Sequence, residues 1–283
     1  MPISNGPRTT DDPTFTQPRW FDRETRRQQL DDAVDRSRTA TFGFRKMASE
    51  TKVHSVCAHF DKVAPNYDFM NNVCSLGIQM LWKQAAIRSL GLRPGDAVLD
   101  VCGGTADLAL LAARRTGPGG RTVVYDINRS MLKYGRPKVE RAGLPGRIDF
   151  VQGDAERITF PDRSFDAVMV GFGIRNLTHL VRGFREMVRV LKPRGRFMCL
   201  EFSKPVNPVF RWLYDFHSFK VMPWLGEVLV GNREGYVCLP ETIRLFPLPD
   251  ELSRILSDEG LQHVQYRRLT NGIAVIHVGT RPC

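Results

Sequence analysis

The stretch Ala97-Val-Leu-Asp-Val-Cys-Gly-Gly-Thr-Ala-Asp-Leu-Ala-Leu-Leu-Ala-Ala-Arg-Arg115 decides the fold of this chain. Residues 97–100 are mostly apolar and predict a buried parallel strand, followed by a glycine turn and by a helix with an apolar stripe over 107–115. Such a unit forms a cradle for a nucleotide, because Gly104 lets a ligand approach the backbone and the helix presents unpaired N–H groups. Asp100, at the end of the strand, can accept a hydrogen bond or orient a cation.

Two carboxylates distinguish this cradle from one for a dinucleotide. A dinucleotide-binding loop has the pattern G-x-G-x-x-G and places a pyrophosphate at the helix N-terminus. Here Asp100 and Asp107 flank Gly103 and Gly104, and their charges would repel a pyrophosphate. The same charges suit a ligand that carries an ammonium and a sulfonium group, so S-adenosyl-L-methionine is favoured over NAD. Any doubly wound protein needs small residues at this turn, so the glycines alone leave both cofactors open.

Composition excludes several classes of protein. The 283 residues, 42% hydrophobic and 25% charged, suit a soluble α/β domain with appendages. No apolar run approaches the roughly 20 residues that span a bilayer, so any membrane contact must be peripheral. The net charge of +11 attracts anionic surfaces, but the basic residues are scattered among acids without a recognition motif, so we expect no nucleic acid partner. The six cysteines form no C-x-x-C pair and no metal-ligand spacing with histidine, which predicts free thiols and no metal site.

The order of patterns along the chain predicts one domain with two additions. Residues 1–40 are polar and proline-rich, and we expect a disordered tail there, with a polar helix conceivable over 23–35. The domain covers 41–283. A helical cap is expected over 53–90, and an insertion over 204–245 interrupts the alternation of strands and helices. We expect the alternating segments to form a parallel sheet that closes with an antiparallel hairpin.

Acids follow two further predicted strands. Asp126 ends the strand 121–125 about twenty residues after the glycine turn, where a ribose diol is held in such folds; the alternative is that it caps the next helix. Asp154 follows the strand 148–152 and can accept a hydrogen bond from an adenine amine. The fourth strand opens into the loop 171–176, which should face the reacting centre because that strand ends beside the cradle.

The segment 209–225 is dense in aromatic residues with a few basic ones between them. Three interpretations stay open: a lid over an apolar substrate, a contact with a membrane surface, or ordinary core.

These motifs together resemble the ubiquinone and menaquinone biosynthesis C-methyltransferases. The resemblance runs from about Thr41 to the C-terminus and rests on the runs 63–71, 75–83, 103–105, 126–132, 172–176, 200–205 and 241–247, with Tyr236. It implies a class I S-adenosylmethionine-dependent methyltransferase fold, that is, a Rossmann-like, seven-stranded, mostly parallel sheet. It also implies C-methylation of a polyprenylated quinol ring, of the benzoquinol or the demethylmenaquinol type.

The resemblance also implies roles for individual residues. Thr105, Asp126, Asp154, Ala155 and Gly171 would bind the cofactor, together with Asp100 and Gly104 of the cradle. Two positions depart from the family pattern: Cys102 stands where alanine is commoner, and Ala106 stands where glycine is usual. An alanine with positive φ would be strained, so we expect a helical φ at Ala106.

The chemistry requires a quinol hydroxyl to lose its proton so that the neighbouring ring carbon can attack the sulfonium methyl. Arg175 and Asn176 are the predicted catalytic residues. A guanidinium stays protonated, so Arg175 would stabilise the phenolate or order a water that accepts the proton. The alternative is that Arg175 pairs with an acid such as Asp154 or Glu201. Candidates for substrate contact, chosen by position alone, are Tyr67, Asp68, His217, Tyr236 and His59.

Two other functions remain open at this stage: a class I methyltransferase for another small phenol, and a scaffold without catalysis in a quinone-synthesis complex. The expected partners are the polyprenyl quinol and an anionic membrane surface, and a homodimer or a quinone-biosynthesis complex is left open. The expected location is cytoplasmic or peripheral at the inner face of the membrane, on the matrix side in a mitochondrion.

Overall fold

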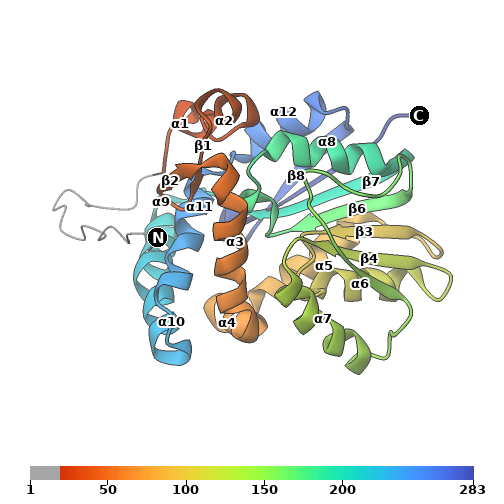
Figure 1. The fold of residues 1–283 in the computed structure, drawn as a ribbon, viewed down its shortest axis with the longest axis horizontal. Helices are drawn as coiled ribbons and strands as arrows, with labels where there is room; N and C mark the ends of the chain where they lie inside the picture. Colours follow the sequence, from red (N-terminus) through yellow and green to blue (C-terminus); the bar gives the residue numbers. More distant parts are fainter. Residues whose placement is uncertain (1–19) are drawn as a thin grey trace.

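The computed structural model describes residues 20–283, and its centre is a seven-stranded sheet (Figure 1). The strand order is β5-β4-β3-β6-β7-β9-β8. The first five strands in this order are parallel, while β9 runs antiparallel to β7 and β8 antiparallel to β9. The strands are β3 (Ala97–Val101), β4 (Arg121–Asp126), β5 (Ile148–Gln152), β6 (Phe165–Gly171), β7 (Leu191–Phe202), β8 (Gln262–Leu269) and β9 (Ala274–Thr280). This confirms the predicted fold class, and the strand order reverses between β3 and β6, where open sheets of this kind bind ligands.

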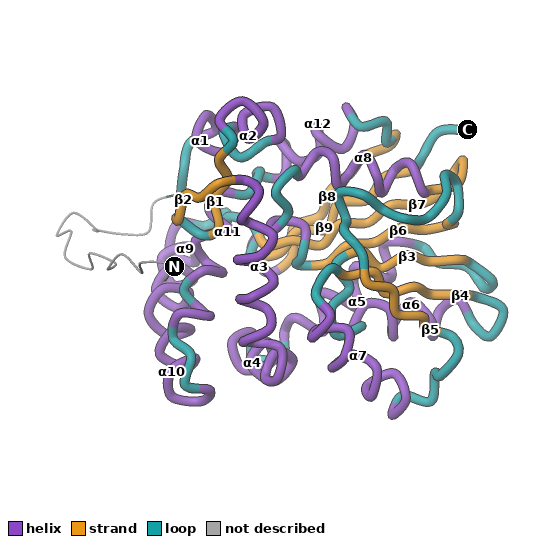
Figure 2. Tube along the Cα trace, in the orientation of Figure 1, coloured by secondary structure: helices purple, strands orange, loops and turns teal. Residues whose placement is uncertain are grey.

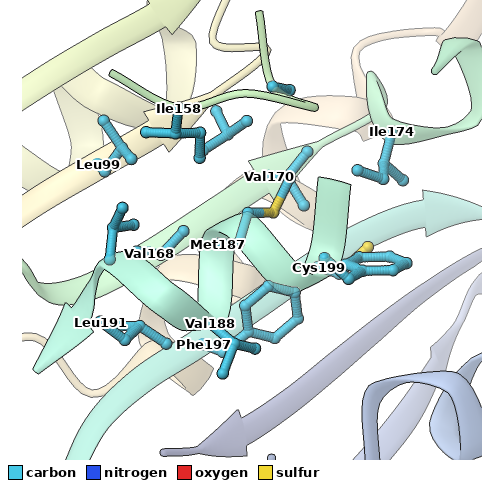
Figure 3. Packing of buried hydrophobic residues seen from close by; sticks show 14 of the residues in the cluster. Leu99, Ile158, Val168, Val170, Ile174, Met187, Val188, Leu191, Phe197 and Cys199 are labelled. Carbon is cyan, nitrogen blue, oxygen red and sulfur yellow. The ribbon is translucent and has the colours of Figure 1, made fainter. Parts of the chain in front are cut away.

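Helices cover both faces of the sheet. On one face lie α8 (Leu180–Val190) and α12 (Pro249–Asp258), whose apolar residues pack with Leu99 of β3 in the cluster of Figure 3. On the other face lie α5 (Ile78–Leu90), α6 (Asp107–Thr116) and α7 (Arg129–Arg141), which pack against Val98 and Val124. Neighbouring residues of one strand thus serve opposite cores, because successive side chains alternate across the sheet. A strand buried on both sides explains the continuous apolar run that the sequence carries there.

Two helical groups stand at one end of the sheet (Figure 2). The cap consists of α3 (Ser49–Val63), η1 (Ala64–Asn66) and α4 (Tyr67–Ser75), whereas α5, also placed in the predicted cap, packs against the sheet. We call the second group the lid: α9 (Pro208–Phe216), the π-helix η3 (His217–Val221), α10 (Met222–Val230), η4 (Glu234–Tyr236) and α11 (Cys238–Leu245). It occupies most of the predicted insertion.

The prediction of a disordered tail is wrong for residues 22–40. They form α1 (Arg23–Arg27), α2 (Asp31–Ser37) and part of β1 (Thr39–Phe42), which pairs with β2 (Arg45–Ala48); residues 1–19 lie outside the described residues. Polar contacts hold this segment: Arg26 makes a two-pronged ion pair with Glu251 at 2.7 and 2.9 Å. Hydrophobic periodicity does not report such contacts, which is why the sequence suggested a tail.

Candidate active site

A single cavity of about 540 Å³ lies where the carboxyl ends of β3, β4, β5 and β6 meet the cap and the lid. Almost every residue predicted from the sequence lines it: Tyr67, Asp100, Gly104, Thr105, Asp126, Asp154, Ala155, Gly171, Arg175, Asn176, His217, Tyr236 and His59. Asp68 is the exception. Residues far apart in the sequence therefore meet at the switch point, as the parallel sheet requires.

The glycine turn contains a correction. Ala106 has φ 71° and ψ 22°, a left-handed conformation, so the helical φ expected for it is wrong. Its N–H donates to Gly103 O at 2.8 Å, which closes the turn before α6 begins. Cys102 is also left-handed, with φ 54°. For a non-glycine residue this conformation costs about 1–2 kcal/mol, and the fully buried Ala106 methyl group contributes apolar contacts in return.

The Asp100 side chain joins the end of β3 to the first turn of α6. Its Oδ2 accepts a hydrogen bond from Ala109 N at 3.0 Å, and its Oδ1 is buried with no partner among residues 20–283. Burial raises the pKa of Asp100 to about 8, and the nearby charge of Asp126 adds to the shift. A buried acceptor that lacks a donor is suited to a cationic ligand.

Asp126 is positioned at the end of β4 by two backbone groups. Its Oδ2 accepts from Gly104 N at 2.9 Å and its Oδ1 from Asn128 N at 2.8 Å, which joins the first two loops of the sheet. The helix cap is a different residue, since the Asn128 side chain accepts from Met131 N at the start of α7. Burial raises the pKa of Asp126 to about 6. Each carboxylate oxygen keeps a lone pair for a further donor such as a ribose hydroxyl.

Asp68 is not among the residues that line the cavity, and its side chain instead bonds to neighbouring elements. Its Oδ1 accepts from Thr105 Oγ1 at 2.6 Å and its Oδ2 from Lys138 Nζ at 2.7 Å. The predicted substrate contact is thereby corrected: Asp68 ties α4 to the glycine turn and to α7. Lys83, which lines the cavity and pairs with Asp107 at 2.6 Å, is a polar wall residue that sequence analysis missed. Lys83 belongs to the run 75–83 that carries the family resemblance, but no site role was assigned to it there.

Arg175 makes the ion pair with Glu201 that the sequence offered as an alternative, and it also lines the cavity. Its Nη1 lies 3.0 Å from both carboxylate oxygens of Glu201, and its guanidinium lies 5.5 Å from the centre of the Phe202 ring. The same side chain lines the cavity, and its buried Nε has no partner among the described residues. Glu201 and Phe202 therefore hold the guanidinium in one orientation and leave an N–H group for a further acceptor.

The positive charge of Arg175 contributes to the pKa shifts of two cap residues, His59 and Tyr67. Burial lowers the pKa of His59 to about 4, with Arg175 as the second cause, so this imidazole is neutral at pH 7. Burial raises the pKa of Tyr67, and Arg175 opposes that shift. Both groups are uncharged neighbours of a fixed cation.

The lid supplies the opposite wall, which is largely apolar. His217 reaches the cavity from the π-helix, a distortion that often marks functional sites, and burial lowers its pKa. Burial raises the pKa of Tyr236 to about 12. Apolar residues of β1, the cap, α5, the central sheet with its loops, and the lid complete the wall: Phe42, Phe60, Trp82, Phe172, Phe202, Leu213, Met222 and Ile243. The cavity thus has an acidic end at the sheet and an apolar end at the lid.

The comparisons with known proteins agree with this geometry. The model of the ubiE/COQ5 methyltransferase family matches residues 41–281. The chain belongs to this family. A relative from Ectopseudomonas mendocina, a ubiquinone/menaquinone biosynthesis C-methyltransferase, is 43% identical over 250 residues, 88% of this chain and 98% of its own. A relative with the same description from Pseudomonas putida strain W619 is 44% identical over 244 residues, 86% of this chain and 95% of its own.

Solved structures support the fold of this ubiE/COQ5 family member. The [4+2]-cyclase SpnF matches with a TM-score of 0.59 at 17% identity, covering 80% of this chain and 96% of its own. An S-adenosylmethionine-dependent methyltransferase from Aquifex aeolicus matches with a TM-score of 0.53 at 19% identity, covering 75% of this chain and 96% of its own. Because one fold serves a cyclase and a methyltransferase, the family match and the site determine the reaction.

As a member of this methyltransferase family, the chain is an S-adenosyl-L-methionine-dependent enzyme, and the residues present fit that cofactor. The unpartnered Asp100 Oδ1 offers a hydrogen-bond acceptor, and the carboxylate of Asp126 offers negative charge, at the end where an ammonium and a sulfonium need them. Gly104 approaches the cavity closely, and a Cβ on it would lie 3.1 Å from Met131 Cε. The acidic end therefore accepts a cationic nucleoside and leaves the apolar end for a second substrate.

Proposed function

We propose that this enzyme methylates a ring carbon of a polyprenylated quinol in respiratory quinone biosynthesis, with a benzoquinol or a demethylmenaquinol as substrate. The observation that carries the proposal is the composition of one cavity: acids at the sheet, the cationic Arg175 in its wall, and apolar residues at the lid. A quinol hydroxyl suits the guanidinium, and a prenyl chain suits the apolar end. The descriptions of the relatives point to the same substrates.

The cofactor supplies an electrophilic methyl group when bound. Asp126 would accept hydrogen bonds from the ribose, Asp154 would accept from the adenine amine, and Thr105, Ala155 and Gly171 would form the surrounding surface. Because the backbone groups of Gly104 and Asn128 already orient the Asp126 carboxylate, its binding geometry exists before the ligand arrives.

Arg175 would act on the substrate oxygen. Its free Nε–H can donate to the oxygen that becomes a phenolate, while Glu201 and Phe202 prevent the guanidinium from moving. The hydroxyl proton would pass to a water near Arg175 and Asn176, and the hydrogen on the methylated ring carbon would then leave as a proton, so that the ring becomes aromatic again. The lid residues Tyr236 and His217 would contact the ring or its chain, and together with the cap they exclude bulk water from the reacting carbon.

Labelled S-adenosyl-L-methionine tests the proposal directly. Incubation with a demethylated benzoquinol or naphthoquinol that carries a prenyl chain should place the label on a ring carbon, and the same ring without a chain should react with a higher KM. Absence of transfer to both ring types would refute the proposed substrate class. Efficient transfer to a chainless phenol, with neither quinol accepted, would favour the other small-molecule methyltransferase.

We further propose that the outer face of the lid contacts an anionic membrane. Large apolar side chains there are half or more exposed: Val209, Trp212, Leu213, Phe216, Trp224 and Val228. Trp212 and Phe216 stack with ring centres 6.2 Å apart, and Leu213 lies both on this face and in the cavity wall. No helix in residues 20–283 is long and apolar enough to cross a membrane. A surface contact beside the cavity would let a lipid-soluble substrate enter without passing through water.

Sedimentation with vesicles tests this contact. Binding to vesicles with anionic lipid should fall when Trp212 and Trp224 are both changed to Ser, and a Tyr134→Ser variant, which alters an exposed aromatic on α7, should bind as the parent does. If the double variant binds vesicles unchanged, the proposal fails. A double variant that instead shifts from dimer to monomer in solution would assign this face to a second copy of the chain.

A further inference from the structure

The loop that carries Arg175 and Asn176 is followed by a histidine that lies between two carboxylates. His179 Nδ1 lies 2.8 Å from Glu156 Oε2, and its Nε2 lies 3.0 Å from Asp35 Oδ1. Three segments meet at this ring: the loop after β5, the helix α2 and the loop before α8. Both nitrogens of an imidazole are thus used, which fixes the ring's orientation.

Glu156 connects this histidine to the cofactor end of the cavity. Its Oε1 accepts from Thr178 N at 2.6 Å and from His179 N at 3.0 Å, while its own N–H donates to Asp154 Oδ1 at 2.9 Å. Through its backbone N–H and its carboxylate, Glu156 therefore links the predicted adenine-binding residue to the backbone that follows Asn176. A displacement of the loop after β5 would therefore also displace the loop that carries Arg175 and Asn176.

The helix α2 holds the same region from outside. Asp31 accepts from Val181 N at 2.8 Å and from Arg182 N at 2.7 Å, and so caps α8, which has no side-chain cap of its own. Lys52 of α3 donates to Leu177 O at 2.6 Å from the cap side. Ion pairs and caps from three elements thus hold residues 177–182, while the catalytic candidates lie immediately before them.

We propose that His179 is a positioning residue for methyl transfer, held by Glu156 and by Asp35 of the N-terminal segment, and that it sets the loop carrying Arg175 relative to the bound cofactor. The inference rests on the proposed function. Its chemical reason is that an in-line transfer tolerates little displacement of the group that stabilises the phenolate, so a loop shift of about 1 Å can cost up to about 100-fold in rate.

The test compares two polar anchors of α8. His179→Ala removes the anchor beside the catalytic loop, and Arg185→Ala removes an exposed pair with Glu259, at 2.9 and 3.1 Å, on the same helix. We expect His179→Ala to lower kcat at least about 10-fold, with the Kd of S-adenosyl-L-methionine in calorimetry within about twofold of the parent, because the Asp126 contacts are untouched. Arg185→Ala should leave kcat unchanged.

Two substitutions of Asp35 distinguish a loss of positioning from a loss of folding. Asp35→Asn keeps an oxygen that can accept from His179 and should retain near-parental kcat, whereas Asp35→Ala should lower it in the same direction as His179→Ala. Equal kcat for His179→Ala and Arg185→Ala would overturn the proposal. A cofactor Kd that rises in proportion to the loss of kcat would also overturn it, by making His179 part of cofactor binding.

Hydrogen exchange in the cofactor-bound enzyme gives a readout that needs no quinol. The amides of residues 174–179 should exchange faster in His179→Ala than in the parent or in Arg185→Ala. Unchanged exchange would refute the coupling. If the parent transfers no methyl group to any quinol, the proposed function fails, and the exchange experiment still decides whether His179 holds this loop.

Discussion

The two ends of the cavity are built in opposite ways. At the sheet, Asp100 is buried and Asp126 half-buried, and both accept hydrogen bonds from backbone N–H groups, so the cofactor end is ordered before any ligand binds. At the lid, α9 has no buried residue, and Trp212 and Phe216 are more than half exposed. The comparison indicates that the acidic end owes its shape to the fold, while the outer face of the lid leaves large apolar side chains exposed.

The largest effect should come from the middle of the cavity. Arg175→Lys keeps a cation beside Glu201 but loses the fixed Nε–H, so we expect kcat to fall by about 100-fold or more. The Kd of the cofactor should stay close to the parental value. Arg189→Lys, which alters an ion-paired arginine of α8 away from the cavity, is the matched control in the methyl-transfer assay. A lysine variant as active as this control would remove Arg175 from the chemistry.

A smaller effect is expected at the acidic end. Asp126→Ala should weaken cofactor binding by about 10- to 100-fold, the usual value of hydrogen bonds to a charged group. Because the pKa of Asp126 is about 6, parental binding of the cationic cofactor should strengthen as pH rises from 5 to 7, and the variant should lose this part of the pH dependence. Calorimetry at these pH values decides the point; identical profiles would contradict it.

The buried carboxyl of Asp100, at the same end of the cavity, should make the stability of the protein depend on pH. With a folded pKa of about 8, the native state keeps a proton that the unfolded chain releases near pH 4, so the parent loses stability as pH rises from 4 to 8. Asp100→Asn can still accept from Ala109 N and removes this titration. The melting temperature should exceed the parental one by a few degrees at pH 8 and match it at pH 4. A gain that is equal at both pH values would mean that Asp100 does not titrate in this range.

The smallest effect, a change in the free energy of unfolding, is expected for a substitution in the lid. Trp212→Ser should change the free energy of unfolding by less than about 0.5 kcal/mol, because the side chain is 60% exposed. A core aromatic gives the contrast: Phe184→Ala, at a fully buried position of α8, should cost about 3–5 kcal/mol. Denaturant unfolding measures both. A large loss at Trp212 would show that the lid face is part of the core.

The strands and the acids at their ends could be predicted from the sequence, whereas contacts between distant segments could not. The strands around Leu99 and the acids at positions 100, 126 and 154 were placed correctly because apolar runs and strand ends are local signals. Asp68 was misplaced, since its bonds to Thr105 and Lys138 cross 37 and 70 residues of sequence. A polar helix over 23–35 was anticipated, but the contacts that order α1 and α2, such as Arg26 with Glu251, are likewise distant in sequence.

The amino-acid sequence by itself determined the order of strands and helices and the kind of ligand at the end of the parallel strands. Burial on both faces demands continuous apolar runs, and a cationic nucleoside demands acids. Only the tertiary structure decided that Arg175 lies against Glu201, that Ala106 is left-handed, and that Asp31 of α2 caps α8. These depend on which distant segments the sheet brings together, and no local pattern records that.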